Sequence, residues 1–188
     1  MVLRAYIFRL MGVFILAIFV TGCVQMSEIE TDEGAGLNGG FEITRNGLPV
    51  NWQMYTPNTV PESKFEIVLD GTEFKEGKQS LRFDVEACQP IGGWKSPGIA
   101  RQFKDKTEGN YKVSFWYKNK GASFYLDAGG VSPKHGNMKK LIVSDEDVSQ
   151  WKYMDYEITV EKDNMLRLEW SVLKPGVFWI DDVRIEKR

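Results

Sequence analysis

The sequence predicts an all-β fold, built as a two-sheet antiparallel β-sandwich. From residue 37 onward, apolar and polar residues alternate in short runs, and Gly, Pro, Asn or Asp separates one run from the next. We find no convincing amphipathic helix pattern in this part of the chain. About nine or ten such runs fall within roughly 150 residues, and this spacing is typical of a sandwich.

Two runs, Ser80–Glu86 and Asn110–Lys118, are clear strands, because their apolar residues fall on alternate positions. Further candidates are Ser123–Asp127, Tyr153–Val160, Met165–Val172 and Phe178–Glu186. Weaker candidates are Gly40–Thr44, Phe65–Leu69 and Ile99–Lys104. The links Gln89–Gly98 and Ser132–Lys140 are too long for tight hairpins, so they are predicted to be loops, where binding residues are often found.

The chain begins with the pattern of an export signal. Arg4 and Arg9 precede an apolar run over Leu10–Val20, and small residues then lead to Cys23. The order Val20-Thr21-Gly22-Cys23 resembles the lipobox of bacterial lipoproteins, which implies that residues 1–22 are removed and that Cys23 is lipidated. The alternative is a retained transmembrane anchor, but the run is far shorter than the ~20 residues that span a bilayer.

The mature chain divides into a tether and a domain. Residues 23–36 are polar and acidic after the lipidated cysteine, so they are predicted to form a flexible tether, and residues 37–188 form the sandwich. Loss of the two signal arginines takes the formal net charge from −2 to −4, which gives no attraction for nucleic acid. The predicted location is the bacterial cell envelope, at the outer membrane or cell surface. Cys88 is left without a partner, as a small buried residue or a thiol open to pairing with another chain.

Five segments carry a resemblance to a known fold family. They are Leu37–Glu42, Gly47–Trp52, Gly77–Leu81, Tyr111–Lys118 and Val177–Ile185. In this order and spacing they resemble the galactose-binding-like jelly rolls of carbohydrate-binding module families 4, 9 and 22. The resemblance covers essentially all of Leu37–Lys187 and implies a jelly-roll sandwich that binds glycans. The same fold also carries protein, lipid and nucleic-acid binders and occurs within enzymes.

The resemblance also implies a structural calcium ion where the first and last strands meet. Glu42 and Asp181 are the positions that match such a site. Calcium takes six to eight oxygen ligands, several of them from carboxylates. The alternative is an exposed carboxylate pair at a strand end.

Side chains opposite the apolar faces form the predicted ligand surface. Strand alternation turns Trp116 away from the core, together with six other residues: Arg82, Asp84, Tyr125, Asp127, Arg167 and Glu169. If their strands share one sheet, these residues form a shallow patch, and Trp94 in the loop Gln89–Gly98 closes one rim. Flat aromatics with a few polar groups suit a sugar ring. The alternatives are that a loop covers Trp116 and that the charges form solvated pairs.

These features favour a membrane-anchored, non-catalytic protein that captures a polysaccharide or oligosaccharide. The first alternative is an envelope module of the same fold that binds other proteins. The second is a small glycoside hydrolase or polysaccharide lyase, since two outward carboxylates are all that a glycosidase needs. The single histidine, His135, lies in a loop with no nucleophile motif beside it, and a small sandwich leaves little room for an active-site cleft.

Overall fold

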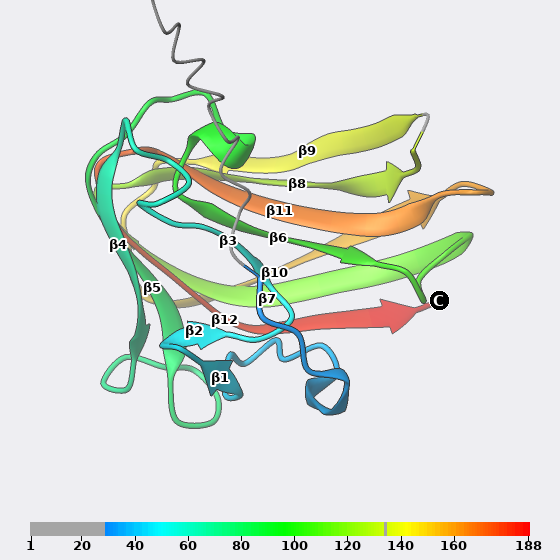
Figure 1. The fold of residues 1–188 in the computed structure, drawn as a ribbon, viewed down its shortest axis with the longest axis horizontal. Coiled ribbons are helices and arrows are strands. Elements are labelled where there is room, and N and C mark those ends of the chain that lie inside the picture. Colours follow the sequence, from blue (N-terminus) through cyan, green and yellow to red (C-terminus); the bar gives the residue numbers. More distant parts are fainter. Residues whose placement is uncertain (1–28, 134) are drawn as a thin grey trace, which may run out of the picture.

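The structure is a computed structural model, and it describes residues 29–133 and 135–188. Two antiparallel five-stranded sheets pack face to face, which confirms the predicted sandwich (Figure 1). Their strand orders are β3-β6-β11-β8-β9 and β10-β7-β12-β5-β4. We name them the β11 sheet and the β12 sheet after their central strands.

The β11 sheet contains β3 (Gln53–Tyr55), β6 (Gly98–Phe103), β11 (Met165–Lys174), β8 (Ser123–Val131) and β9 (Gly136–Ser144). The β12 sheet contains β10 (Val148–Val160), β7 (Gly109–Lys120), β12 (Gly176–Lys187), β5 (Ser80–Ala87) and β4 (Lys64–Asp70). A small hairpin of β1 (Thr44–Arg45) and β2 (Leu48–Pro49) and two short 3-10 turns, η1 (Glu33–Ala35) and η2 (Gly93–Lys95), complete the described elements. The consecutive strands β7 and β8 lie in different sheets.

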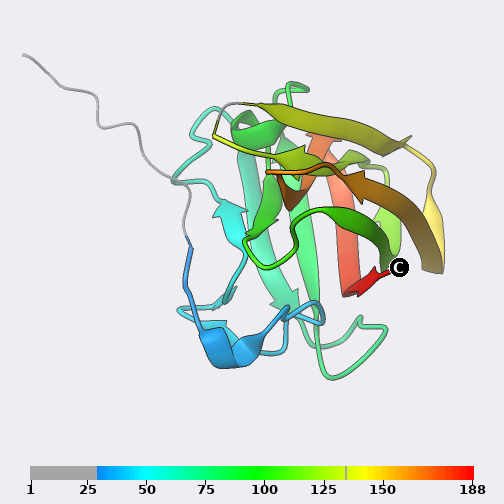
Figure 2. The ribbon, with the colours of Figure 1, turned by 90° about the vertical axis from the view of Figure 1, so that its right-hand side faces the viewer.

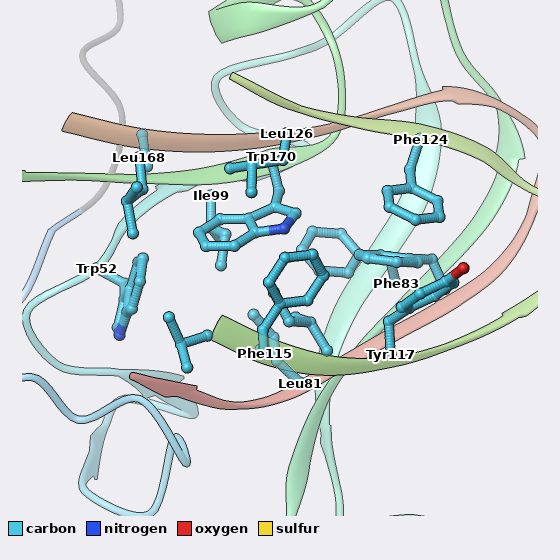
Figure 3. Packing of buried hydrophobic residues seen from close by; sticks show 14 of the residues in the cluster. Trp52, Leu81, Phe83, Ile99, Phe115, Tyr117, Phe124, Leu126, Leu168 and Trp170 are labelled. Carbon is cyan, nitrogen blue, oxygen red and sulfur yellow. The ribbon is translucent and has the colours of Figure 1, made fainter. Parts of the chain in front are cut away.

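Aromatic side chains from both sheets fill the core (Figure 3). Phe115 of β7 meets Trp170 of β11 edge to face, with ring centroids 5.4 Å apart. Phe124 of β8 stacks on Phe178 of β12 at 4.3 Å. Such pairs add specific geometry to the burial of large apolar areas. Trp52 is fully buried.

The N-terminal part of the domain turns sharply before the hairpin. Gly39 packs so closely against the main chain of Val183 that a Cβ would collide with its carbonyl oxygen. Phe41 is buried, and its ring lies 5.7 Å from that of Trp52. The predicted strand Gly40–Thr44 does not form, because Asn38 and Phe41 have positive φ angles and hydrogen bonds from the Asn38 side chain fold this segment back on itself.

The described end of the predicted tether lies against the domain. The Asn51 side chain accepts from the Asp32 amide at 2.8 Å and donates to the Gly36 carbonyl at 3.1 Å. Figure 2 shows this blue segment along one side of the sandwich. The remaining tether residues, the predicted signal and Cys23 lie outside the described residues. Within residues 29–133 and 135–188, no helix is long and apolar enough to span a bilayer.

Part of one predicted loop is a strand in the structure. The segment Ser132–Lys140, predicted as a loop, contains the start of β9, because this edge strand pairs with β8 despite its polar residues.

Cys88 is half-buried and packs against the core, and burial raises the pKa of its thiol. This environment agrees with the interpretation of Cys88 as a small buried residue.

Candidate functional site

The predicted ligand patch is divided between the two outer faces of the sandwich. Arg82 and Asp84 of β5 and Trp116 of β7 lie on the β12 sheet. Four other predicted residues lie on the β11 sheet: Tyr125 and Asp127 of β8, and Arg167 and Glu169 of β11. The expectation of one continuous patch is therefore wrong. Alternation correctly indicates which side of a strand a residue occupies, but it carries no information about which sheet the strand joins.

The outer face of the β11 sheet holds a connected polar network. Arg167 Nη2 donates to Glu169 Oε2 at 2.7 Å and to the Tyr55 hydroxyl at 3.0 Å. The Tyr55 hydroxyl donates to the same Glu169 oxygen at 3.2 Å. Burial, followed by the Glu169 charge, raises the pKa of Tyr55, so the hydroxyl stays neutral at physiological pH. Side chains from two strands, β3 and β11, thus hold one carboxylate in a defined orientation, although β6 lies between these strands in the sheet.

Tyr125 fixes the loop that carries Trp94. The Tyr125 hydroxyl accepts from the Gly93 amide at 2.7 Å, at the start of η2. Gly92 has φ +85°, and a Cβ there would collide with the Tyr125 hydroxyl, so only glycine allows this approach. Trp94 follows directly and is 64% exposed. The structure therefore brings Trp94, Tyr125 and the Glu169 network to one region.

Asp127 and Lys140 complete this region. Asp127 lies between Glu169 on β11 and Lys140 on β9 in the strand register. Lys140 Nζ stands 3.7 Å from the centroid of the Tyr125 ring. Asp127 Oδ1 is buried and has no hydrogen-bond partner among the described residues. Burial raises the pKa of the Asp127 carboxyl, and the smaller effect of the Lys140 charge opposes this rise. We call the following set the β11 face: Tyr55, Trp94, Tyr125, Asp127, Lys140, Arg167 and Glu169.

The outer face of the β12 sheet is organised differently. The Trp116 ring lies 5.2 Å from that of Tyr153 and carries Lys75 Nζ at 4.1 Å from its centroid. Arg82 donates to both Asp70 and Asp84 at 2.8 Å. Arg82 and Asp84, two of the predicted ligand residues, therefore already bond to each other, as the alternative of charge pairs expects.

The residues predicted to bind calcium are surrounded by hydrogen-bond donors. Asp181 is fully buried, and its Oδ2 accepts from the main-chain amides of Lys75 and Glu76 at 2.7 and 3.0 Å. Glu42 Oε1 accepts from the amides of Lys78 and Gln79 at 2.8 and 3.2 Å.

A calcium ion at this site would need oxygen atoms that are free to coordinate it. Asp181 Oδ1 accepts from the Asp182 amide, and the nearby Phe41 carbonyl accepts from the Gln79 side chain. Within the described residues, no three His, Cys, Asp or Glu side chains are placed to hold a metal ion. This arrangement does not fit a calcium ion, since N–H groups already donate to three of the four carboxylate oxygens of Glu42 and Asp181.

Sequence reasoning missed two residues of the β11 face. Tyr55 lies on the three-residue strand β3, which follows the buried Trp52. The only sequence pattern that could have indicated Tyr55 is strand alternation, which places it on the opposite side of the strand from its neighbour, the buried Met54. Lys140 lies in the part of β9 that was predicted to be a loop, where adjacent lysines mask the strand pattern.

No family model matches the sequence, and no curated protein matches it either. Solved structures do match. The xylan-binding domain CBM22-1 of Paenibacillus barcinonensis Xyn10C superimposes with a TM-score of 0.54 at 15% identity, over 79% of this chain and 91% of that one. The C-terminal family 22 carbohydrate-binding module of Clostridium thermocellum Xyn10B gives 0.55 at 16%, over 84% and 96%. The fold is that of a carbohydrate-binding-module jelly roll.

A third match, TmCBM61 in complex with β-1,4-galactotriose, gives a TM-score of 0.52 at 18% identity, over 81% of this chain and 97% of that one. At these identities the likeness establishes the jelly-roll fold, and the resemblance predicted from the sequence is confirmed at that level. The jelly roll accounts for the two sheets and the antiparallel strand order. What the chain binds depends on the side chains of its own faces.

Proposed function

We propose that this protein is a non-catalytic, glycan-binding lipoprotein, and that the β11 face is its binding site. The observation that carries the proposal is that the exposed Trp94 directly follows Gly93, whose amide donates to Tyr125 on the same face as the Arg167–Glu169 pair. A sugar ring offers an apolar C–H face to an aromatic ring and hydroxyl groups to charged side chains. An aromatic side chain and a fixed carboxylate on one exposed face meet both requirements.

The solved jelly rolls support the same class of ligand. Those described above include a xylan-binding domain and a module in complex with β-1,4-galactotriose. A xylanase fragment with CBM22-1 and GH10 modules, 26% of which matches this chain, is described in complex with xylohexaose. We therefore expect this chain to bind a polysaccharide or oligosaccharide along the β11 face.

The same proposal assigns a role to the N-terminal signal. Cys23, lipidated after removal of residues 1–22, holds the domain at the outer membrane or cell surface. One acyl chain gives marginal membrane binding, whereas two or more anchor a protein stably. Many copies held on one surface bind a repeating glycan with higher avidity than a single domain does.

Isothermal titration calorimetry on the full mature protein in detergent micelles tests the proposal. The titrants are xylohexaose, β-1,4-galactotriose and a wider glycan panel, and the products are then examined for chain cleavage. The proposal expects binding to at least one glycan and no cleavage. Absence of binding to every glycan favours a protein-binding module, and release of shorter oligosaccharides favours a hydrolase or lyase.

A further inference from the structure

One oxygen on the β11 face lacks a hydrogen-bond donor. Asp127 Oδ1 is buried and has no partner among residues 29–133 and 135–188. Its neighbour on β11, Glu169, receives bonds from Arg167 and Tyr55. Buried acceptors are nearly always paired in native proteins, so an unpaired one needs an explanation. A donor supplied by a ligand is one such explanation.

Lys140 is the cation best placed to satisfy Asp127, yet it does not. The two residues lie opposite each other on β9 and β8. No ion pair within 4.0 Å joins Lys140 to a carboxylate of the described residues, and its Nζ stands over the Tyr125 ring at 3.7 Å. With the lysine there, Tyr125 is only 4% exposed. Lys140 therefore occupies the surface on which a sugar ring would stack.

The lysine is held weakly. Its side chain is exposed on β9, an edge strand of the β11 sheet. A cation–π contact from a solvent-exposed lysine gains little energy, and a long side chain is free to take other rotamers. The lysine is therefore easily displaced, whereas the Tyr125 hydroxyl is held by a hydrogen bond from the Gly93 amide.

We propose that Lys140 is a displaceable cap and that one unit of a neutral glycan takes its place. The apolar face of that sugar stacks on Tyr125, and one of its hydroxyl groups donates to Asp127 Oδ1. This inference rests on the proposed glycan-binding function and specifies its ligand class. A uronic acid or sulfated sugar at this position would bring a negative charge beside two carboxylates, Asp127 and Glu169, and is disfavoured.

Two variants with matched controls test the cap by calorimetric titration of the full mature protein. Lys140→Ala removes the competitor, so its affinity for the neutral glycan should rise about threefold to tenfold, whereas Lys139→Ala, on the same strand, should change nothing. Asp127→Ala should weaken binding at least tenfold without lowering the melting midpoint, because Asp127 Oδ1 has no partner among the described residues. Its control is Asp84→Ala, which breaks a bond to Arg82 on the opposite sheet and should leave glycan binding unchanged.

The titration results distinguish failure of the Lys140 cap from failure of the proposed glycan-binding function. If the wild type binds a glycan and both Lys140→Ala and Asp127→Ala bind it equally well, the cap is overturned and the proposed function stands. If neither the wild type nor Lys140→Ala binds any glycan of the panel, both proposals fail. Stronger binding of oligogalacturonate than of xylohexaose or galactotriose would contradict the neutral ligand class.

Discussion

Asp127 and Glu169 lie directly opposite each other on β8 and β11, and the donors of this region serve Glu169. Arg167 and Tyr55 fix Glu169, while Asp127 Oδ1 is left unpaired among the described residues. A rigid acceptor therefore stands beside an unsatisfied one, next to two aromatic rings. This pairing makes the β11 face a more suitable glycan site than the β12 face, where Arg82 bonds both of its neighbouring aspartates.

Substitution of Trp94 should separate binding from folding. The side chain is 64% exposed, so Trp94→Ala should leave the melting midpoint within about one degree of the wild type. Loss of a stacking platform should reduce glycan affinity about tenfold or more, which corresponds to about 1.4 kcal/mol. Tyr153→Ala, an exposed aromatic on the opposite sheet, is the matched control. Equal loss of binding in both variants would speak against the β11 face.

Trp116→Ala tests whether the outer face of the β12 sheet binds glycan. Strand alternation places Trp116 in the predicted patch, and the loop Gln89–Gly98 places Trp94 at its rim, but in the structure they belong to opposite faces. We expect Trp116→Ala to retain glycan binding within about twofold, measured by affinity electrophoresis in gels that contain the polysaccharide. Loss of retention in Trp116→Ala with full retention in Trp94→Ala would move the site to the β12 sheet.

Sequence patterns predict the local features well and the long-range ones poorly. Alternation places Tyr125, Asp127, Arg167 and Glu169 outward, and all four lie on one face. The division of strands between sheets depends on how the chain crosses from β7 to β8 through a short turn, and no residue pattern encodes that crossing. The edge strand β9 also escapes detection, because an exposed edge tolerates the charged residues that usually mark a loop.

Removal of Arg167 should destabilise the domain. Arg167→Met leaves the partly buried Glu169 carboxylate without its charged donor, since the side chain of Glu169 is only 14% exposed. The expected cost is about 1–3 kcal/mol in the free energy of unfolding, measured by urea denaturation. The double variant Arg167→Met with Glu169→Gln should recover part of this loss. An additive loss in the double variant would show that the pair is not coupled.

Calcium should have no effect on stability. Three of the four carboxylate oxygens of Glu42 and Asp181 already accept hydrogen bonds from main-chain amides, those of Lys75, Glu76, Lys78, Gln79 and Asp182. The melting midpoint by calorimetry should therefore be the same with excess calcium and with a chelator. A midpoint that rises with calcium concentration would restore the metal site that the family resemblance implies.

Asp181 should make stability depend on pH in a defined direction. Burial raises the pKa of its carboxyl from 3.8 to about 6. A raised folded-state pKa contributes stability that is complete below the unfolded value and is lost as pH rises through the folded value. The difference in unfolding free energy between the wild type and Asp181→Asn should therefore shift against the wild type between about pH 4 and pH 7. A constant difference over that range would contradict the raised pKa.

The central claim is that a glycan binds across Trp94, Tyr125 and Glu169. The most direct test is an NMR titration of the isotope-labelled mature protein with the tightest-binding oligosaccharide, following amide and indole signals. We predict shifts that saturate at the Trp94 indole, at Gly93 and along β8 and β11, with the signals of Trp116 and Tyr153 unmoved. Saturating shifts that centre on Trp116 and Tyr153 instead would contradict the account.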